Sequence, residues 1–295
     1  MGLKPDVQQT TKLPSRSLFH SETVEIGLFD CPRNHPMFHD SGPIRHYLVV
    51  FPRHAVRIKY DSQTEVVATR QVITLYNDGQ EYRREGISDY GDQSIWLRFH
   101  QPEVVEALAA NGRQHADVEK TPFAWTHAHC DSATYLLQRK LAQSLMAGDA
   151  PDFLEITETA LQLLHLAVQG TQKMQVRCRA SAKANGTTDR HRRLVRQCEA
   201  LLAAEYHQPL TLEAIAHRLA TSPFHLSRVF TRHAGKSIHQ YLLQLRLRAA
   251  MDRMIDHPGE RFTDIGLEFG FATPSHFSQA FNRHFGMTPR QFRSG

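Results

Sequence analysis

The sequence predicts an α+β protein of two domains, with a β-rich N-terminal half and an all-α C-terminal half. Alternating strand patterns without intervening helices fill residues 23–99, helical periodicity follows them, and the last hundred residues contain one helical unit twice. The 295 residues suffice for about two domains. A hydrophobic content of 41% is enough for packed cores.

Four runs of β-forming residues support the strand prediction. They are HYLVVFP (46–52), AVRIKY (55–60), EVVATRQVITLYN (65–77) and SIWLRFH (94–100). In the last run Ile95, Leu97 and Phe99 alternate with Trp96 and Arg98, as in a strand with two different faces. Short strands in succession favour an antiparallel sandwich or barrel. The polar residues 1–20 predict a flexible arm.

Helical patterns begin after the last strand. Residues 102–110 predict a short helix with a proline in its first turn, and residues 131–147 and 151–168 predict two longer amphipathic helices. This helical pair has a surplus apolar face, which either covers the β-rich half or joins two copies of the chain as a homodimer.

Domain boundaries follow from the stretch after the helical pair, which is polar and basic and has little periodicity. We predict a linker at 171–189, an effector-sensing and dimerisation domain at 1–170, and a DNA-binding domain at 190–295.

The net charge of +5 is unevenly distributed. Residues 190–295 hold 15 basic and 8 acidic side chains, whereas residues 1–189 hold 20 basic and 22 acidic ones. A basic half joined to a near-neutral one indicates that the C-terminal half binds a polyanion. The alternative, a solvated basic surface without a partner, is not excluded by charge alone.

Four dispersed cysteines, Cys31, Cys130, Cys178 and Cys198, form no CxxC pair. They suggest neither a disulfide framework nor a zinc finger. The N-terminus lacks the apolar core of a signal peptide, and no stretch approaches the ~18 apolar residues of a membrane span. We therefore expect a soluble, cytoplasmic protein with no membrane partner.

The repeated unit occurs as LEAIAHRLATSPFHLSRVFTRHAG (212–235) and FTDIGLEFGFATPSHFSQAFNRHFG (262–286). Each copy contains two short runs of helical periodicity separated by a turn, which is typical of a helix-turn-helix. The offset between matching residues changes from fifty to fifty-one at the turn. An inserted residue there leaves both apolar faces intact.

Thr211, Ser222 and Thr273 are predicted helix N-caps, because their hydroxyls can accept from the unpaired N–H groups of the first turn. Pro223 and Pro274 take the first helical position, where an N–H is not needed. The second helix of each unit then buries an apolar face. These faces consist of Leu226, Val229 and Phe230 in the first copy and of Phe277, Ala280 and Phe281 in the second.

The opposite faces of these two helices carry polar side chains that suit DNA. They are His225, Ser227, Arg228, Thr231 and Arg232, followed by Ser275, His276, Ser278, Gln279, Asn282 and Arg283. Arginine and glutamine can form paired hydrogen bonds with base edges in the major groove, and serine, histidine and free N–H groups can reach phosphates. Each residue alone is compatible with a solvated surface, but two matched sets favour DNA contact.

Residues 238–255 lack glycine and proline and predict one continuous helix between the two units. Such a connector could hold both recognition helices on one face of a duplex, about one helical turn (~34 Å) apart. One chain could then contact two successive segments of the major groove.

Residues 190–293 resemble the DNA-binding domain of the AraC/XylS family of bacterial transcription regulators. The resemblance rests on the pattern LxxIAxxLxxSxxHLSRxFxxxxGxSxxxYLxxxRLxxA from Leu212 to Ala250 and on DIGLEFGFATPSHFSQAFNRHFGMTPRQFR from Asp264 to Arg293. It implies seven helices in two subdomains and binding to double-stranded promoter DNA. It also implies contact with RNA polymerase, which favours activation over repression.

By position, the resemblance assigns base contacts to Phe224, His225, Ser227 and Arg228 on the first recognition helix and to Ser275, His276, Ser278 and Gln279 on the second. Ser275 and Ser278 are short for contact with bases. We therefore expect the second helix to contribute less sequence information.

The β-rich half, with its following helices, resembles the cupin-like sensor and dimerisation domain of many family members. This likeness rests on architecture and order rather than on a motif. It implies a β-barrel that binds a small effector, which residues 1–170 do not identify, and we expect no cofactor. Candidates that either line a sensor pocket or form ordinary core are Pro43, Phe51, Tyr76, Tyr82, Tyr90 and Trp96.

Two clusters contain metal-ligand side chains: Cys31, His35 and His39, and then His127, His129 and Cys130. Prolines around the first cluster disfavour a helix that would align its members, and the second lies after the predicted strands. We expect ordinary loop residues and no metal. A metal- or redox-responsive regulator that uses the first cluster is the alternative.

Two further alternatives to a regulator are considered. One is an enzyme, either a metal cupin or a DNA-repair alkyl acceptor fused to the tail. We expect no enzyme and no catalytic residue, because strand-borne metal ligands and clustered cysteines are missing from the pattern. The other is an interaction protein that uses helix-turn-helix units as a scaffold, which the exposed Arg, Gln, Asn and Ser side chains oppose.

Overall fold

The structure, a computed structural model, describes residues 14–40, 42–61, 64–112, 121–147, 152–182 and 188–294. Residues 1–13 of the predicted arm, the connection at 148–151 and residues 183–187 of the predicted linker lie outside these ranges. Side chains at 175–182 and 188 are likewise outside the description.

The N-terminal half contains two antiparallel sheets. The larger has the strand order β1-β2-β8-β3-β6-β9, and the smaller has the order β5-β4-β7. The strands are β1 (Ser15–His20), β2 (Val24–Cys31), β3 (Tyr47–Pro52), β4 (Val56–Lys59), β5 (Glu65–Ala68), β6 (Val72–Tyr76), β7 (Arg83–Gly86), β8 (Asp92–Phe99) and β9 (His127–His129). The antiparallel prediction is confirmed. The predicted barrel is not, because the described strands form two separate sheets and no closed barrel.

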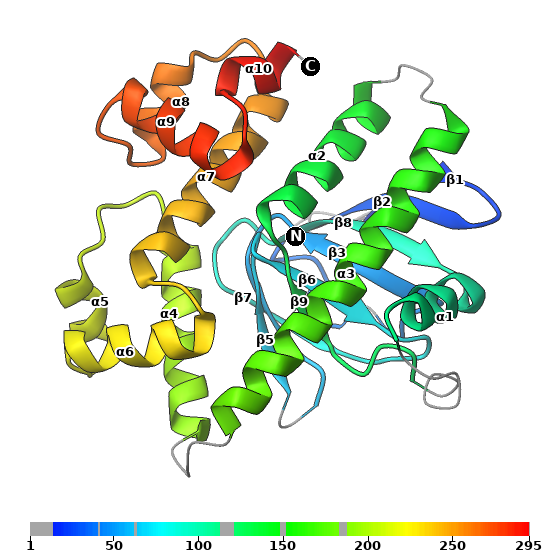
Figure 1. Ribbon diagram of the computed structural model, residues 1–295, viewed down its shortest axis with the longest axis horizontal. Helices are drawn as coiled ribbons and strands as arrows, with labels where there is room; N and C mark the ends of the chain where they lie inside the picture. The colour runs from blue at the N-terminus through cyan, green and yellow to red at the C-terminus, as the bar shows by residue number, and fades with distance from the viewer. Residues whose placement is uncertain are drawn as a thin grey trace, which may run out of the picture.

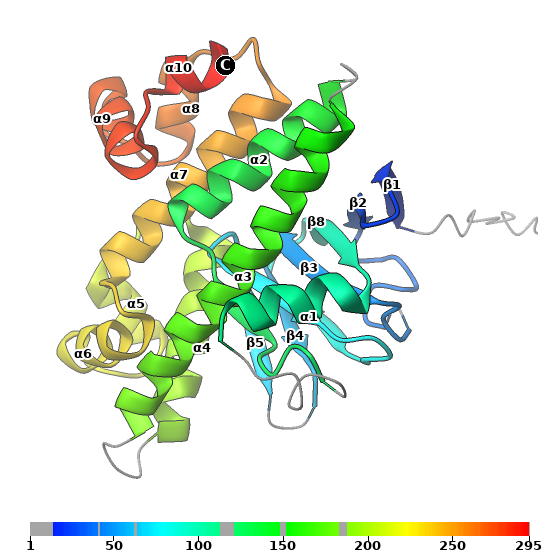
Figure 2. The same ribbon diagram turned by 45° about the vertical axis from the view of Figure 1, so that its right-hand side comes forward.

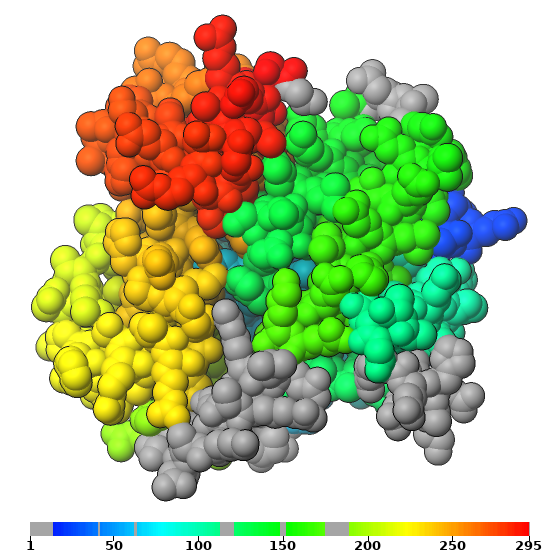
Figure 3. Space-filling view, in the orientation of Figure 1, coloured from blue at the N-terminus to red at the C-terminus, as the bar shows by residue number. Residues whose placement is uncertain are grey.

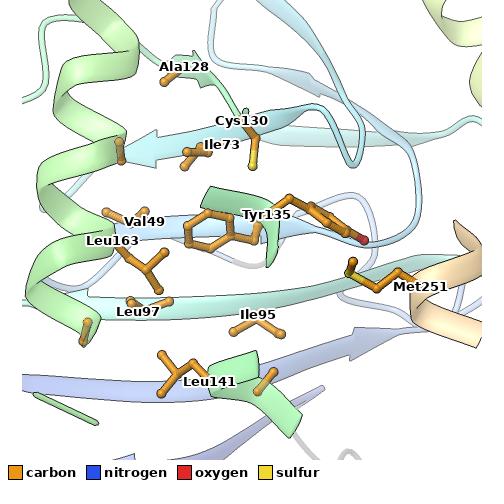
Figure 4. Close-up of a cluster of buried hydrophobic side chains, with 14 of the residues drawn as sticks. Val49, Ile73, Ile95, Leu97, Ala128, Cys130, Tyr135, Leu141, Leu163 and Met251 are labelled. Atoms are coloured by element: carbon orange, nitrogen blue, oxygen red, sulfur yellow. The ribbon is translucent and has the colours of Figure 1, made fainter. Parts of the chain in front are cut away.

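Each face of the larger sheet has its own core. On β8, Ile95, Leu97 and Phe99 join an apolar cluster beneath the helices, whereas Trp96 and Arg98 line a cavity on the other face. Figure 4 shows the helix-covered cluster, with side chains from the sheet and from helices α2 and α3 packed together. The alternation predicted for this strand therefore separates a dry core from a cavity.

Three helices cover that face of the sheet (Figures 1 and 2): α1 (Gln101–Ala110), α2 (Ser132–Ala147) and α3 (Phe153–Ala182). The predicted helical pair is confirmed, but α3 continues past Val168 into the stretch predicted as a linker. The buried face of α3 continues past Val168 as well, because Gly170 is buried.

Three further predictions are corrected. Residues 15–20 of the predicted arm form β1, which pairs with β2. The run 65–77 is two strands rather than one, and Thr69–Gln71 turn between the two sheets. His127 and His129 lie on strand β9, which pairs with β6, rather than in a loop.

The C-terminal half is all helical. Its helices are α4 (Thr188–Glu205), α5 (Leu212–Arg218), α6 (Pro223–Ala234), α7 (Ile238–Asp256), α8 (Phe262–Glu268), α9 (Pro274–Phe285) and α10 (Pro289–Ser294). The predicted connecting helix is α7, in one piece. Among the described helices, none is long and apolar enough to cross a membrane.

Candidate nucleic-acid interface

The first helix-turn-helix consists of α5 and α6. The Thr211 hydroxyl accepts from the Ala214 N–H at 3.1 Å, and the Ser222 hydroxyl accepts from the His225 N–H at 3.2 Å. Pro223 occupies the first turn of α6, and Gly235 ends the helix in the left-handed conformation. The predicted caps and start are confirmed. The start and end of α6 are therefore set locally, by its own first and last turns.

In the second helix-turn-helix, which consists of α8 and α9, helix α9 repeats the arrangement of α6, whereas no side chain caps α8. The Thr273 hydroxyl accepts from the His276 N–H at 3.1 Å, Pro274 takes the first turn, and Gly286 provides the left-handed end. Phe277 and Phe281 are fully buried, as predicted, whereas Ala280 is half-buried.

The two units lie toward opposite ends of α7 and are separate small bodies (Figures 1 and 2). The first packs around Ile215, Leu226 and Phe230, and the second around Ile265 and Phe277. In the space-filling view they lie one above the other along one flank of the molecule (Figure 3). The continuous helix α7 thus sets the spacing between α6 and α9.

None of the twelve predicted contact residues is buried. Nine are exposed: Phe224, Arg228, Thr231, Arg232, Ser275, His276, Gln279, Asn282 and Arg283. Three are half-buried: His225, Ser227 and Ser278. Phe224 is 77% exposed, which is unusual for a large apolar side chain and is expected where a partner covers the surface. Both sets thus lie where a duplex could reach them.

His191 belongs to this surface but was not among the predicted residues. It lies on α4, with its ring centroid 5.4 Å from that of His225 and 6.0 Å from that of His233. Burial and the neighbouring charge of His225 lower its pKa, as do nearby arginines. The arginines at 190, 192 and 193 were a sequence signal that α4 extends the basic surface.

The N-terminal half contains a cavity of about 190 Å³ between its two sheets. Of the six aromatic or rigid candidates, Tyr76, Tyr82 and Trp96 line it. Phe51 instead packs in the core beneath the helices, Pro43 is exposed, and Tyr90 is exposed with its ring centroid 5.1 Å from that of His54. The remaining lining is mostly apolar, with Thr74, Asp92, Ser94 and Arg98 as polar contributions.

The first candidate metal cluster does not converge on one point. The His35 ring accepts from the Met37 N–H, His39 Nδ1 lies 3.0 Å from the Arg84 carbonyl oxygen, and Cys31 is buried. Within the described ranges, no group of three or more His, Cys, Asp or Glu side chains could hold a metal ion.

Burial lowers the fraction of reactive thiolate at the described cysteines. It raises the pKa of Cys31, and it raises the pKa of Cys130 to about 11 and that of Cys198 to about 12. A thiol with a raised pKa forms little of the reactive thiolate at neutral pH. This opposes the alternative of redox sensing by Cys31.

Comparisons with known proteins concern mainly the C-terminal half. Residues 215–295 match the family model described as a helix-turn-helix domain. The chain is 36% identical over 98 residues to the HTH-type transcriptional regulator ArgR of Pseudomonas aeruginosa, covering 33% of this chain and 30% of ArgR. It is 30% identical over 149 residues to the HTH-type transcriptional activator RhaS of Salmonella arizonae, covering 50% of each. The chain thus spans half or less of the length of these relatives.

Solved structures give matches of the same kind. A transcriptional regulator from Chromobacterium violaceum, described as containing an AraC-type DNA-binding domain, is 30% identical, with 35% of this chain and 91% of that chain covered and a TM-score of 0.33. The family match therefore rests on sequence. By its C-terminal helices, this chain belongs to the AraC/XylS family of helix-turn-helix transcription regulators.

Proposed function

We propose that the chain regulates transcription by binding promoter DNA through α6 and α9, in response to a small effector held by its N-terminal half. The observation that carries the proposal is the pair of matching recognition helices, with the same cap, the same starting proline and polar outer faces. Exposed arginine, glutamine and asparagine side chains supply both base and phosphate contacts. By resemblance, Phe224, His225, Ser227 and Arg228, together with Ser275, His276, Ser278 and Gln279, contact bases.

The sensor part of the proposal rests on the cavity between the two sheets. Its mostly apolar lining with a few polar groups is typical of small-molecule sites. A cupin-like sensor half would place an effector there. Such a regulator acts in the bacterial cytoplasm, where promoter DNA is found, and activation through RNA polymerase is the mode that the family resemblance favours.

A homodimer remains part of the prediction. Leu154 and Leu161 on α3 are exposed apolar side chains, so part of the helical pair does not cover the sheet, whereas the exposed Phe153 lies with its ring centroid 4.6 Å from that of Phe19 on β1. Of the two alternatives for the helical pair, contact with a second copy of the chain is the one that would bury these side chains.

The DNA-binding proposal is tested by titrating duplex DNA with the full chain over a range of salt concentrations. The variant Arg228→Ala/Arg232→Ala/Arg283→Ala removes three exposed charges from the candidate interface, and Arg16→Ala/Arg45→Ala/Arg83→Ala removes three from the N-terminal half. We expect the first variant to bind at least about a hundredfold more weakly, with a salt slope smaller by about 2, because fewer counterions are released. We expect the second to match the unmodified chain. Equal losses in both variants would contradict the proposal.

A further inference from the structure

Helix α7 faces the N-terminal half along a stripe of polar side chains. Tyr241, Arg248, Asp252 and Asp256 follow one another at intervals of seven, four and four residues, which places them on one side of a helix. The Gln71 side-chain amide donates to the Tyr241 carbonyl oxygen at 2.8 Å. The two halves are thus joined through polar groups over most of the length of α7.

Asp252 is the centre of this contact and is only 2% exposed. Its carboxylate lies 2.7 Å from Arg70 Nε, 3.1 Å from Arg139 Nε and 3.6 Å from Arg53 Nε. The Tyr135 hydroxyl also donates to it at 2.9 Å. All four groups come from the N-terminal half. One carboxylate therefore holds together the β3–β4 turn, the β5–β6 turn and α2.

The neighbouring turns of α7 extend the contact. Arg253 points elsewhere, to Glu260, but Arg53 also pairs with Asp256. One turn before Asp252, the Arg248 guanidinium donates to the carbonyl oxygens of Arg70 and Cys130.

An apolar contact lies beside these polar ones. Met251 lies beside the Tyr135 side chain (Figure 4) and belongs to the same buried cluster as Cys130. Cys130 itself is fully buried at this junction.

The charge balance makes Asp252 indispensable to the closed contact. Burial alone would raise its pKa, but Arg139, Arg70 and Arg53 outweigh burial and hold the pKa well below its usual range. Without the carboxylate, three guanidinium groups would face one another in a buried site, which is strongly destabilising. If the two halves separate instead, the guanidinium groups that α7 covers regain access to water. Loss of Asp252 should therefore open the interface rather than unfold either half.

Two arginines of this contact lie within two residues of the cavity lining. Pro52 and Ala68 both line it, Arg53 is the next residue after Pro52, and Arg70 lies two residues after Ala68. A molecule that moves the ends of β3 and β5 must move these guanidinium groups relative to Asp252. The cavity and the contact with α7 are thus joined by very short segments of chain.

We propose that Asp252, Arg53, Arg70 and Arg139 form an interdomain latch through which the occupied cavity releases the DNA-binding half. The latch rests on the proposed function of the cavity as an effector site. Released, α7 and its two helix-turn-helix units move as an intact body. Both recognition helices thereby gain orientational freedom relative to the N-terminal half at the same time.

Three buried cysteine thiols allow a test of the latch. Cys130 is buried at the interface, Cys31 in the core between the sheets and Cys198 in the core of the first helix-turn-helix unit. The rate at which a maleimide modifies each thiol, mapped by mass spectrometry, measures how often each site opens. The test uses the full chain with Asp252→Asn and, as the matched control, Asp264→Asn, which breaks an exposed ion pair in the same half.

We expect Asp252→Asn to accelerate modification of Cys130 about a hundredfold and to leave Cys31 and Cys198 within twofold. Arg70→Gln should give a smaller acceleration of the same thiol, and Asp264→Asn none. An unchanged Cys130 would show that other contacts hold the interface, and equal acceleration at all three thiols would show a general loss of stability. Either result overturns the latch.

The coupling between the cavity and the latch is tested by placing larger side chains in the cavity lining. Val50→Phe adds volume on a cavity-lining strand, and Leu48→Phe does so two residues earlier. We expect at least one of them to accelerate modification of Cys130 tenfold or more relative to Cys198. No acceleration in either variant would overturn the coupling. The DNA titration described above does not depend on these modification rates. If Cys130 reacts as expected but the chain does not bind DNA, the proposed function is refuted and the latch is not.

Discussion

The two helix-turn-helix units have one design built from different residues. Ala220, with φ +50°, stands in the turn of the first unit where Gly270, with φ +76°, stands in the second. The first core is largely aliphatic, around Ile215 and Leu226, whereas the second is built mainly from phenylalanines. Both recognition helices have a hydroxyl cap, a starting proline and a left-handed glycine end, whereas of the preceding helices only α5 has a side-chain cap. The comparison shows that the helix boundaries define the motif, and the core residues adapt to it.

The outer faces differ more than the cores. The first unit presents Arg228 and Arg232, whereas the second presents Gln279, Asn282 and Arg283 beside two short serines. Long cationic side chains reach both base edges and phosphates, and serines reach little of either. We therefore expect the first unit to supply more of the sequence preference.

The largest expected difference between the two units is in DNA binding. We expect Arg228→Ala to weaken binding to the preferred site by about 10- to 100-fold and to relax the preference at one base pair, because a paired contact with a base is worth about 1–3 kcal/mol. Gln279→Ala should cost less than Arg228→Ala. Titration of single-base variants of the site measures both effects, and an equal relaxation by Gln279→Ala would show that the units share the preference evenly.

The two turns respond differently to exchange of their residues. A Cβ on Gly270 would lie 2.9 Å from the guanidinium carbon of Arg246. The nitrogens of this guanidinium group donate to the carbonyl oxygens of Tyr206 and Gln208. We expect Gly270→Ala to lower the free energy of unfolding by about 2 kcal/mol, from left-handed strain and weakened hydrogen bonds. Ala220→Gly should change it by less than about 1 kcal/mol, because relief of strain offsets the freer unfolded chain. Denaturant titration measures both changes in the free energy of unfolding. Equal changes for Gly270→Ala and Ala220→Gly would contradict the difference between the two turns.

The smallest effect concerns matching histidines near the ends of the recognition helices. Burial, with Arg248 and Lys236 nearby, lowers the pKa of His284 to about 3, whereas His233 is shifted in the same direction mainly by burial. Below pH 6.5 His284 is protonated in the unfolded chain but stays neutral in the folded chain, so the free energy of unfolding falls as the pH falls. The loss approaches about 1.4 kcal/mol per pH unit for one such group. We expect His284→Gln to flatten unfolding free energy between pH 6.5 and 5 more than His233→Gln. The reverse order would contradict the assigned environments.

Local signals explain why the C-terminal half was predictable. Thr211, Ser222 and Thr273 act on N–H groups two or three residues away, so their role is visible in a short window of sequence. The connecting helix and the exposed faces followed from periodicity alone. Strand β8 was predictable for the same reason, because its alternation separates two faces.

Features that depend on distant partners were not predictable. The turn at Thr69–Gln71 contains neither glycine nor proline, so one run of β-formers hid two strands in different sheets. The sequence places Arg53, Arg70, Arg139 and Asp252 far apart, and each alone is an ordinary charged residue. Their burial arises only when α7 docks on the N-terminal half. The cavity likewise requires both sheets.

The most direct test of the account is selection of duplex DNA from a random pool by the full chain at near-physiological salt. We predict an asymmetric site with two blocks about one helical turn apart, one with relaxed base preference in Arg228→Ala and the other with a smaller relaxation in Gln279→Ala. A single block unaffected by either substitution, or no enrichment at all, would contradict binding through both recognition helices.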